Sequence, residues 1–178
     1  MELREDDGTF PVRELHRAAF GADGDHGELV ADLVDDLRRD PATRALVAIE
    51  DGEVVGHVMF SRSRLDAPER LVDVGVLSPL AVLPGYQRRG IGSALIRHGL
   101  DLLESGGVPL VFLEGDPGYY VRAGFQPAGP LGFRKPSLRI PDVAFQVRTL
   151  SAYEPWMTGT LVYSSTFWEH DCVGLREA

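Results

Sequence analysis

The sequence is poor in cysteine and has no long apolar run. Cys172 is the single cysteine among 178 residues, which excludes an internal disulfide, a cluster of thiolate metal ligands and a Cys-x-x-Cys redox pair. No stretch approaches the ~20 continuous apolar residues of a transmembrane helix. The acidic start, Met1 to Asp7, lacks the positively charged region of a signal peptide. We therefore expect a cytoplasmic protein that does not bind membranes.

Positive charge is also scarce. The chain has 18 Lys and Arg against 27 Asp and Glu, a net charge of −9. Nucleic-acid binding depends on clustered Lys and Arg that neutralise phosphates, so we expect no nucleic-acid partner. The same balance favours attraction of cations. The histidines show no metal-ligand spacing, so we expect no metal site; they are His16, His26, His57, His98 and His170.

The remaining composition is that of an ordinary globular domain. Hydrophobic residues make up 44% and charged residues 25%, and 178 residues suffice for one domain with a substantial core. The turn signal Asp51-Gly52 predicts a hairpin, and Pro79, which cannot donate a ladder hydrogen bond, predicts a bulge or splayed strand edge. Residues 129–141 are rich in Gly and Pro and read as a loop. Apolar spacing predicts helices at 10–20, 27–39 and 90–104, and strands at 2–5, 46–49, 54–60, 71–82, 108–113, 145–150 and 159–163.

Residues 80–100 carry the most informative local pattern. They read LAVLPGYQRRGIGSALIRHGL, an apolar strand end, a Pro-Gly turn and a glycine-rich start to a helix. The first N–H groups of a helix lack intrahelical acceptors and the helix dipole adds positive charge, so such a start binds anions. Arg88 and Arg89 add charge-assisted donors at the same place. The pattern predicts an anion site.

The residues present exclude two other glycine loops. A Walker loop needs Gly-Lys-Ser or Gly-Lys-Thr, but the only lysine, Lys135, lies elsewhere. A dinucleotide loop needs a third glycine at the position of Leu95. A purely structural role, in which Gly90 and Gly92 allow close helix–strand packing, stays open.

A second motif follows the predicted strand at 108–113. Residues 120–125 read Tyr-x-x-x-Gly-Phe. Together with Gln-x-x-Gly-x-Gly at residues 87–92, this motif resembles the GNAT superfamily of acyl-CoA-dependent N-acyltransferases, and the YhbS-like acetyltransferases in particular. The resemblance implies an α/β (α+β) fold with a mixed, mostly antiparallel sheet, splayed fourth and fifth strands and flanking helices. We expect the acyltransferase domain at residues 1–150 and an extension, 151–178, packed on it.

The resemblance also implies which residues bind acetyl-CoA. Backbone groups of Leu80, Ala81 and Val82 would hold the pantetheine arm. Tyr120 would act on the CoA sulphur as the general acid. The residues that would cradle the pyrophosphate are Gln87, Arg88, Arg89, Gly90, Ile91, Gly92 and Ser93.

Alternatives remain at two of these positions. Tyr120 could instead anchor a short helix, whereas Tyr119 lies one residue too far from Gly124-Phe125 to start the motif. Many family members have an asparagine after the fifth strand that bonds the pantetheine, and this chain has no asparagine. Asp116 is the nearest polar substitute, and an ionised aspartate cannot donate a hydrogen bond.

The motifs do not identify the general base. The candidates are Asp73, Ser78, His57 and Glu114. The pKa of histidine suits this role best. A role of His57 as a strand residue bonded to its neighbours stays open, as does a water relay or solvent.

The function implied by the resemblance is direct transfer of an acetyl group from acetyl-CoA to a primary amine in a ternary complex. Four acidic residues on the predicted helix 27–39 favour a small cationic acceptor, with Glu28 and Asp32 as contacts, although a solvated helix face stays open. The alternative function is a non-catalytic acyl-CoA-binding sensor. Trp156, Phe167 and Trp168 would pack the end of the chain or form a homodimer surface.

Overall fold

The computed structural model describes residues 1–21 and 24–176, which fall into two compact units. The first unit contains residues 1–61 and 77–101, and the second contains residues 62–76 and the chain from residue 102 onward. Three elements continue from one unit into the other: β3 (Glu53–Asp66), β4 (Leu71–Val82) and α3 (Ile91–Ser105). The domain boundary after Leu150 stays a prediction.

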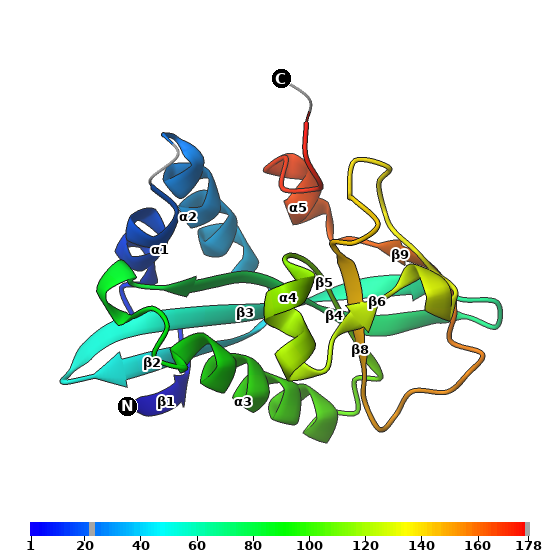
Figure 1. The fold of residues 1–178 in the computed structure, drawn as a ribbon, viewed down its shortest axis with the longest axis horizontal. Helices are drawn as coiled ribbons and strands as arrows, with labels where there is room; N and C mark the ends of the chain where they lie inside the picture. Colours follow the sequence, from blue (N-terminus) through cyan, green and yellow to red (C-terminus); the bar gives the residue numbers. More distant parts are fainter. Residues whose placement is uncertain (22–23, 177–178) are drawn as a thin grey trace. The chain divides into compact units, whose positions relative to one another are not determined.

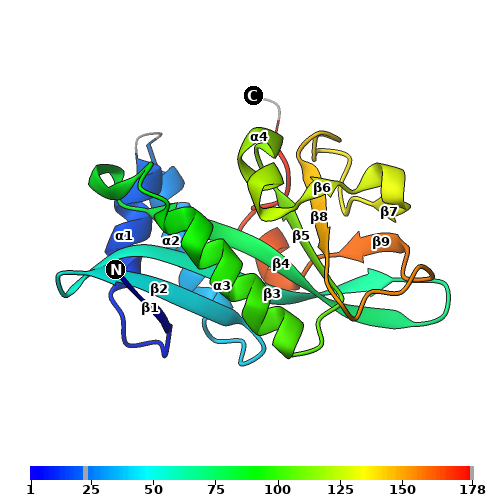
Figure 2. The same cartoon turned by 60° about the horizontal axis from the view of Figure 1, so that its bottom comes forward.

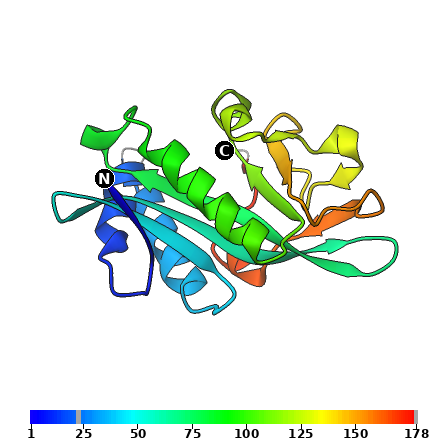
Figure 3. The ribbon, with the colours of Figure 1, turned by 90° about the horizontal axis from the view of Figure 1, so that it is seen from below.

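In the first unit, helices cover both faces of a sheet (Figure 1). β1 (Glu2–Glu5) pairs antiparallel with β2 (Arg44–Glu50), which pairs antiparallel with β3. Asp51 and Gly52 have φ of 50° and 82°, the left-handed geometry of a two-residue hairpin, so the predicted turn is confirmed. α1 (Val12–Phe20) and α2 (His26–Leu37) lie on one face, and α3 crosses the other, as Figure 3 shows from below.

Alternate residues of β3 face opposite helices. A Cβ on Gly56 would lie 3.0 Å from side-chain atoms of Ile91 and Leu95 in α3. A Cβ on Gly99 of α3 would lie 2.1 Å from the ring of Phe60, which is buried. Gly56 and Phe60 therefore point toward α3, and the period of two along a strand turns His57 toward the other face.

The second unit is built around β5 (Leu110–Glu114) and β8 (Phe145–Thr149), which pair antiparallel along their whole length (Figure 2). The ring of Phe112 lies 5.1 Å from that of Phe133 and 5.7 Å from that of Phe145, between ring centroids. The strands that complete the unit are β6 (Gln126–Pro127) beside β8, β9 (Gly159–Val162) beside β3, and β7 (Phe133–Arg134) beside β9.

The pairing is mostly antiparallel, with a short parallel contact between β4 and β5. That contact joins Gly75 to Val111 and Val76 to Phe112. β4 continues to Val82 through a cis Ser78–Pro79 bond. The predicted mixed, mostly antiparallel sheet flanked by helices is confirmed, and the parallel contact has the short register expected of a splayed pair.

Several short elements differ from the sequence prediction. The expected loop at 129–141 contains two short elements, η4 (Gly129–Leu131) and β7. Helical turns that the apolar pattern did not predict are η2 (Pro84–Tyr86), α4 (Pro117–Tyr120), η3 (Val121–Ala123) and α5 (Ser165–Glu169). Each is too short to show a helical period. Within the described residues, no helix is both long and apolar enough to span a bilayer.

Candidate active site

The loop between β4 and α3 presents a row of backbone N–H groups for which the described residues supply no backbone acceptor. Arg88 and Gly90 have φ of 60° and 84°, and these left-handed residues turn the chain before α3 begins. Ala94 N donates to Gly90 O at 3.0 Å, the first hydrogen bond at this helix end. In the described part of the chain, none of the N–H groups of residues 88–93 donates to a backbone carbonyl. The loop therefore has the donors of the predicted anion site.

The side chains of this loop have different roles. Gln87 donates from Nε2 to Val82 O at 3.1 Å and so ties the loop to the end of β4. Arg89 pairs with Glu50 at 2.9 Å and lies 5.2 Å above the ring of Tyr86. Arg88 is exposed and makes no ion pair with any described residue, so its guanidinium is available to an anion.

The surroundings of the loop leave room for a ligand. A Cβ on Gly90 would meet no atom within 4 Å, so the space beside this residue is open. Gly92 and Ile91 are buried in the first turn of α3, and Ser93 is exposed. At the end of β4, Ala81 is buried, and Leu80 and Val82 are half-buried.

Tyr120, in the second unit, ends the short helix α4. Its ring lies 5.9 Å from that of Phe125 and packs against Gly115, where an added Cβ would lie 2.5 Å from the ring. Burial raises the pKa of Tyr120 to about 12, with smaller contributions from Tyr119 and Asp116. The Tyr120 hydroxyl has no hydrogen-bond partner among the described residues. It is therefore a protonated phenol with a free donor.

Asp116 is the N-cap residue of α4. Its Oδ1 accepts a hydrogen bond from Gly118 N at 2.8 Å, which caps the helix. The carboxylate of Asp116, the nearest polar residue to the position where the resemblance implies an asparagine, is thus held by the backbone of its own helix.

The candidates for the general base differ in exposure and partners. Asp73 is exposed and pairs with Arg64 at 2.8 Å. His57 is fully buried, with both ring nitrogens bonded to side chains. Glu114 is half-buried at the end of β5, and burial raises the pKa of its carboxyl group. Ser78 is half-buried on β4.

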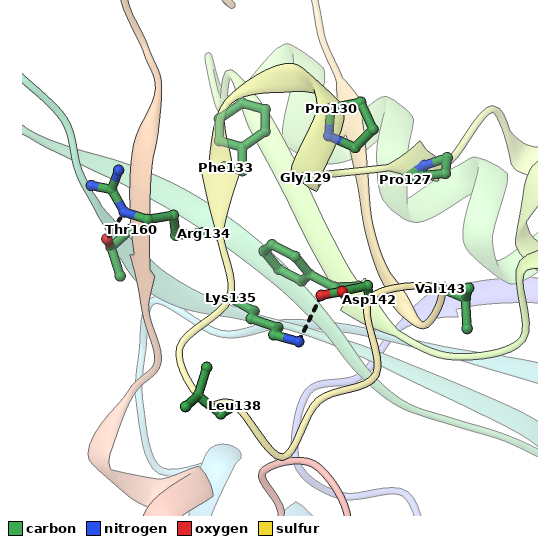
Figure 4. A pocket seen from close by; sticks show the side chains of 11 residues that line it. Pro127, Gly129, Pro130, Phe133, Arg134, Lys135, Leu138, Asp142, Val143 and Thr160 are labelled. Atoms are coloured by element: carbon green, nitrogen blue, oxygen red, sulfur yellow. Dashed lines mark hydrogen bonds and ion pairs between the residues drawn. The ribbon is translucent and has the colours of Figure 1, made fainter.

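The second unit also contains a pocket of about 650 Å³, shown in Figure 4. Its lining is mostly apolar and includes Phe133, Pro130 and Leu138. Leu138 is 95% exposed, and Lys135 and Asp142, which also line the pocket, pair at 2.6 Å. The pocket lies in the Gly- and Pro-rich segment, which the motifs leave unassigned.

Comparison with known proteins identifies the family. The model of the acetyltransferase (GNAT) family matches residues 10–125. This chain belongs to the GNAT acetyltransferase family. It is 36% identical over 152 residues to the uncharacterised N-acetyltransferase YjhQ of Escherichia coli K12, covering 83% of this chain and 82% of YjhQ. It is 39% identical over 144 residues to the uncharacterised N-acetyltransferase YhbS of the same strain, covering 79% and 80%.

Two crystal structures resemble this GNAT chain closely. E. coli YhbS in complex with CoA matches with a TM-score of 0.79 and 31% identity, covering 93% of this chain and 91% of that one. A GNAT acetyltransferase from Brucella melitensis in complex with acetyl-CoA matches with a TM-score of 0.74 and 32% identity, covering 93% and 97%. The resemblance drawn from the two motifs is confirmed.

The acidic residues of α2 contact arginines of α1 in this GNAT protein. Arg13 pairs with Glu28 at 2.9 Å and with Asp32 at 2.6 Å, and it also pairs with Asp35. Arg17 pairs with Glu28 as well. These carboxylates therefore hold α1 and α2 together, and contact of Glu28 and Asp32 with an acceptor stays a prediction. Among the described residues, no group of three or more His, Cys, Asp or Glu side chains is placed to hold a metal ion.

The sequence did not predict a chain of four polar side chains, in which Arg38 is half-buried and the side chains of Asp6, His57 and His16 are buried. Arg38 donates to both carboxylate oxygens of Asp6, at 2.9 and 2.7 Å. Asp6 Oδ2 lies 3.1 Å from His57 Nε2, and His57 Nδ1 lies 2.8 Å from His16 Nε2. The ionised Asp6 carboxylate can only accept, so His57 Nε2 carries the proton and donates the hydrogen bond to it. In the neutral His57 ring, Nδ1 then has no proton and accepts a hydrogen bond from His16 Nε2. His16 Nδ1 is then a buried acceptor, and it has no partner among the described residues.

The pKa shifts in this group of four side chains keep both histidines neutral. Burial lowers the pKa of His16 to about 3, helped by His57 and Arg38. Burial also lowers the pKa of His57, although the hydrogen bond that His57 donates to Asp6 acts to raise it. Burial acts to raise the pKa of Asp6, but the hydrogen bonds with His57 and Arg38 outweigh it and lower that pKa. Asp6 is thus ionised and both rings are neutral at pH 7.

We expect His16 to make the fold sensitive to acid. Above pH ~6.5, its pKa in the unfolded chain, His16 is neutral in both states. As the pH falls below that value, only the unfolded chain takes up the proton, so the free energy of unfolding falls by ~1.4 kcal/mol per pH unit, until the pH reaches the folded pKa. Urea unfolding measured from pH 7 to pH 4 should show that the free energy of unfolding falls less steeply with pH for His16→Gln than for the wild type. The exposed His98→Gln is the control, and equal slopes in wild type and His16→Gln would contradict the expectation.

We expect Gly92→Val to abolish stabilisation by CoA. The valine side chain would enter the first turn of α3, where the free N–H groups lie. For the wild type, CoA at 100 times its Kd should add ~2.7 kcal/mol to the free energy of unfolding. Thermal unfolding with and without CoA measures this. Gly85→Ala is the control in the same loop, because its Cβ would meet no atom within 4 Å. A Gly92→Val protein that folds and keeps the full shift would exclude the loop as the anion site.

Proposed function

We propose that this protein is an N-acetyltransferase that moves an acetyl group from acetyl-CoA to an amine. The observation that carries the proposal is the row of unpaired N–H groups at residues 88–93 in a chain whose close structural relatives hold CoA or acetyl-CoA. A diphosphate suits this loop, because consecutive N–H donors and the helix dipole bind phosphate oxygens. The exposed Arg88 and the open space at Gly90 support the same ligand.

We infer that Tyr120 is the general acid. Bound acetyl-CoA supplies the thioester, whose sulphur gains negative charge as its bond to the acetyl carbon breaks. A phenol with a pKa of about 12 keeps its proton at neutral pH, and its free hydroxyl can donate to that sulphur. Such a donor typically contributes ~10²–10⁴ in rate.

We infer that the acceptor is a small cationic amine. The net charge of −9 raises the local concentration of cations, although Glu28 and Asp32 are already paired with Arg13. The apolar lining of the pocket in Figure 4 suits an acceptor that also has an apolar part.

Tyr120→Phe should lower kcat and leave the KM for acetyl-CoA nearly unchanged. The hydroxyl acts on charge that develops in the transition state, so its loss removes no ground-state binding. Thiol release from acetyl-CoA measures both constants, with Tyr119→Phe as the neighbouring control. Equal kcat in wild type and Tyr120→Phe, with chemistry limiting the rate, would remove Tyr120 as the acid.

The acceptor is tested with spermidine, phenethylamine and L-glutamate, each at low and high salt. We expect the cationic amines to give the higher kcat/KM and to slow as salt screens charges beyond a Debye length of ~8 Å at physiological ionic strength. Preference for L-glutamate, or rates for spermidine that rise with salt, would overturn the cationic acceptor. Binding of CoA with no thiol release for any amine would instead favour a non-catalytic sensor.

A further inference from the structure

Glu114 occupies the last position of β5 and is held by donors from far along the chain. Its Oε2 accepts a hydrogen bond from the Tyr163 hydroxyl at 2.8 Å, and its Oε1 accepts one from Gly174 N at 2.8 Å. These two bonds use part of the acceptor capacity of a carboxylate, which has about four lone-pair sites. Glu114 is half-buried, so the residue is not fully enclosed by the protein.

The proposed general acid, Tyr120, lies next to this end of β5. Gly115, the next residue, packs against the ring of Tyr120. Its backbone is fixed, because Gly115 N donates to Ala144 O and Gly115 O accepts from Gln146 Nε2, both at 3.0 Å. Since consecutive residues of a strand point to opposite faces, Glu114 and Tyr120 lie on the two sides of one backbone segment.

The charged and titratable groups around Glu114 come from three segments. Tyr163 follows β9, Cys172 follows α5, and Arg139 lies in the segment between β7 and β8. Burial raises the pKa of the Glu114 carboxyl group, and Tyr163, Gly174 and Arg139 reduce that rise. Burial beside Glu114 also raises the pKa of Tyr163 well above its usual value, so Tyr163 keeps its proton and donates it.

We propose that Glu114 is the general base that takes the proton from the acceptor's ammonium group, positioned by Tyr163 and Gly174. The proposal rests on the proposed N-acetyltransferase function. Asp73 and His57 are less suited, because Asp73 is tied to Arg64 in solvent and His57 has both nitrogens bonded inside the core. Ser78 is half-buried on β4, and its hydroxyl is a far weaker base than a carboxylate.

The protons and bonds balance in this scheme. Glu114 accepts the first ammonium proton and passes it to solvent. The neutral nitrogen then forms a bond to the acetyl carbon, and the bond from that carbon to sulphur breaks. Tyr120 donates its proton to the sulphur and recovers the second nitrogen proton through water. The products are an acetylated amine, free CoA thiol and one proton.

The test compares the pH dependence of kcat/KM in wild type, Glu114→Gln and Tyr163→Phe. Thiol release is measured from acetyl-CoA with spermidine, phenethylamine and L-glutamate in turn, using whichever is consumed fastest. Glu114→Gln should lose ~10²–10⁴ in kcat/KM at neutral pH, and the loss should shrink at high pH, where solvent deprotonates the amine. Tyr163→Phe removes a hydrogen bond that lowers the pKa of Glu114, so the rising limb of its profile should move to higher pH.

The controls separate this role from a structural one. Glu104→Gln removes another carboxylate that accepts a backbone N–H, from Ser151 at 2.9 Å, and should keep the wild-type profile. All variants should keep the thermal shift produced by CoA. Glu114→Gln activity within twofold of wild type, or a loss that is equal at every pH, overturns Glu114 as the base. If Glu114→Gln does not fold, an unmoved limb in Tyr163→Phe overturns it. A wild type that binds CoA but consumes none of the amines overturns the proposed function and the base together.

Discussion

The close approach of α3 to β3 is the constraint on which the proposed anion-binding loop depends. Gly56 on β3 and Gly99 on α3 allow contacts that any larger side chain would block, since a Cβ at Gly99 would overlap the buried ring of Phe60. With the helix fixed at this depth, its first turn and the left-handed residues Arg88 and Gly90 are fixed relative to the end of β4. Gln87 completes this link through its bond to Val82 O. The unpaired N–H groups are therefore held in place before any ligand arrives, which reduces the entropy lost on binding.

The alternation along β3 gives its two faces different chemistry. Toward α3 the strand presents small and apolar residues, which allow the tight contact. Toward α1 it presents His57, which joins His16 and Asp6 in a buried polar chain. Buried polar groups stabilise a fold only when they are bonded, and here the ion pair of Asp6 with Arg38 anchors the chain at one end. The unpartnered His16 Nδ1 leaves the other end incompletely satisfied. The polar side chains His16, His57 and Asp6 therefore link α1, β3 and the segment after β1. The free energy of unfolding that depends on them falls as the pH is lowered.

The sequence was sufficient for the features that are local and insufficient for those that join distant residues. The turn and helix start of residues 87–93 could be predicted because the turn, the glycines and the helix start are all encoded within a few positions, whereas anion binding there stays a prediction. The proposed base could not be chosen from the sequence, because the bonds that set Glu114 apart from His57 come from Tyr163 and Gly174, 49 and 60 residues away. The chain of His57 with His16 and Asp6 spans 41 and 51 residues and leaves no periodic signal. The acidic residues of α2 were visible, but their arginine partners on α1 follow from helix packing, which no local pattern contains.

A single physical effect, burial at the end of β5, prepares both groups of the proposed acid–base pair. Loss of solvent disfavours the charged form of a carboxyl group and of a phenol alike, so the pKa rises for Glu114 and for Tyr120. The consequences are opposite in function. A higher pKa makes the Glu114 carboxylate a better proton acceptor, whereas it keeps Tyr120 protonated and able to donate. In this proposal each side chain acts on a different atom of the reaction, Glu114 on nitrogen and Tyr120 on sulphur. The donors Tyr163 and Gly174 then limit how far the pKa of Glu114 rises, so the carboxyl group can still ionise.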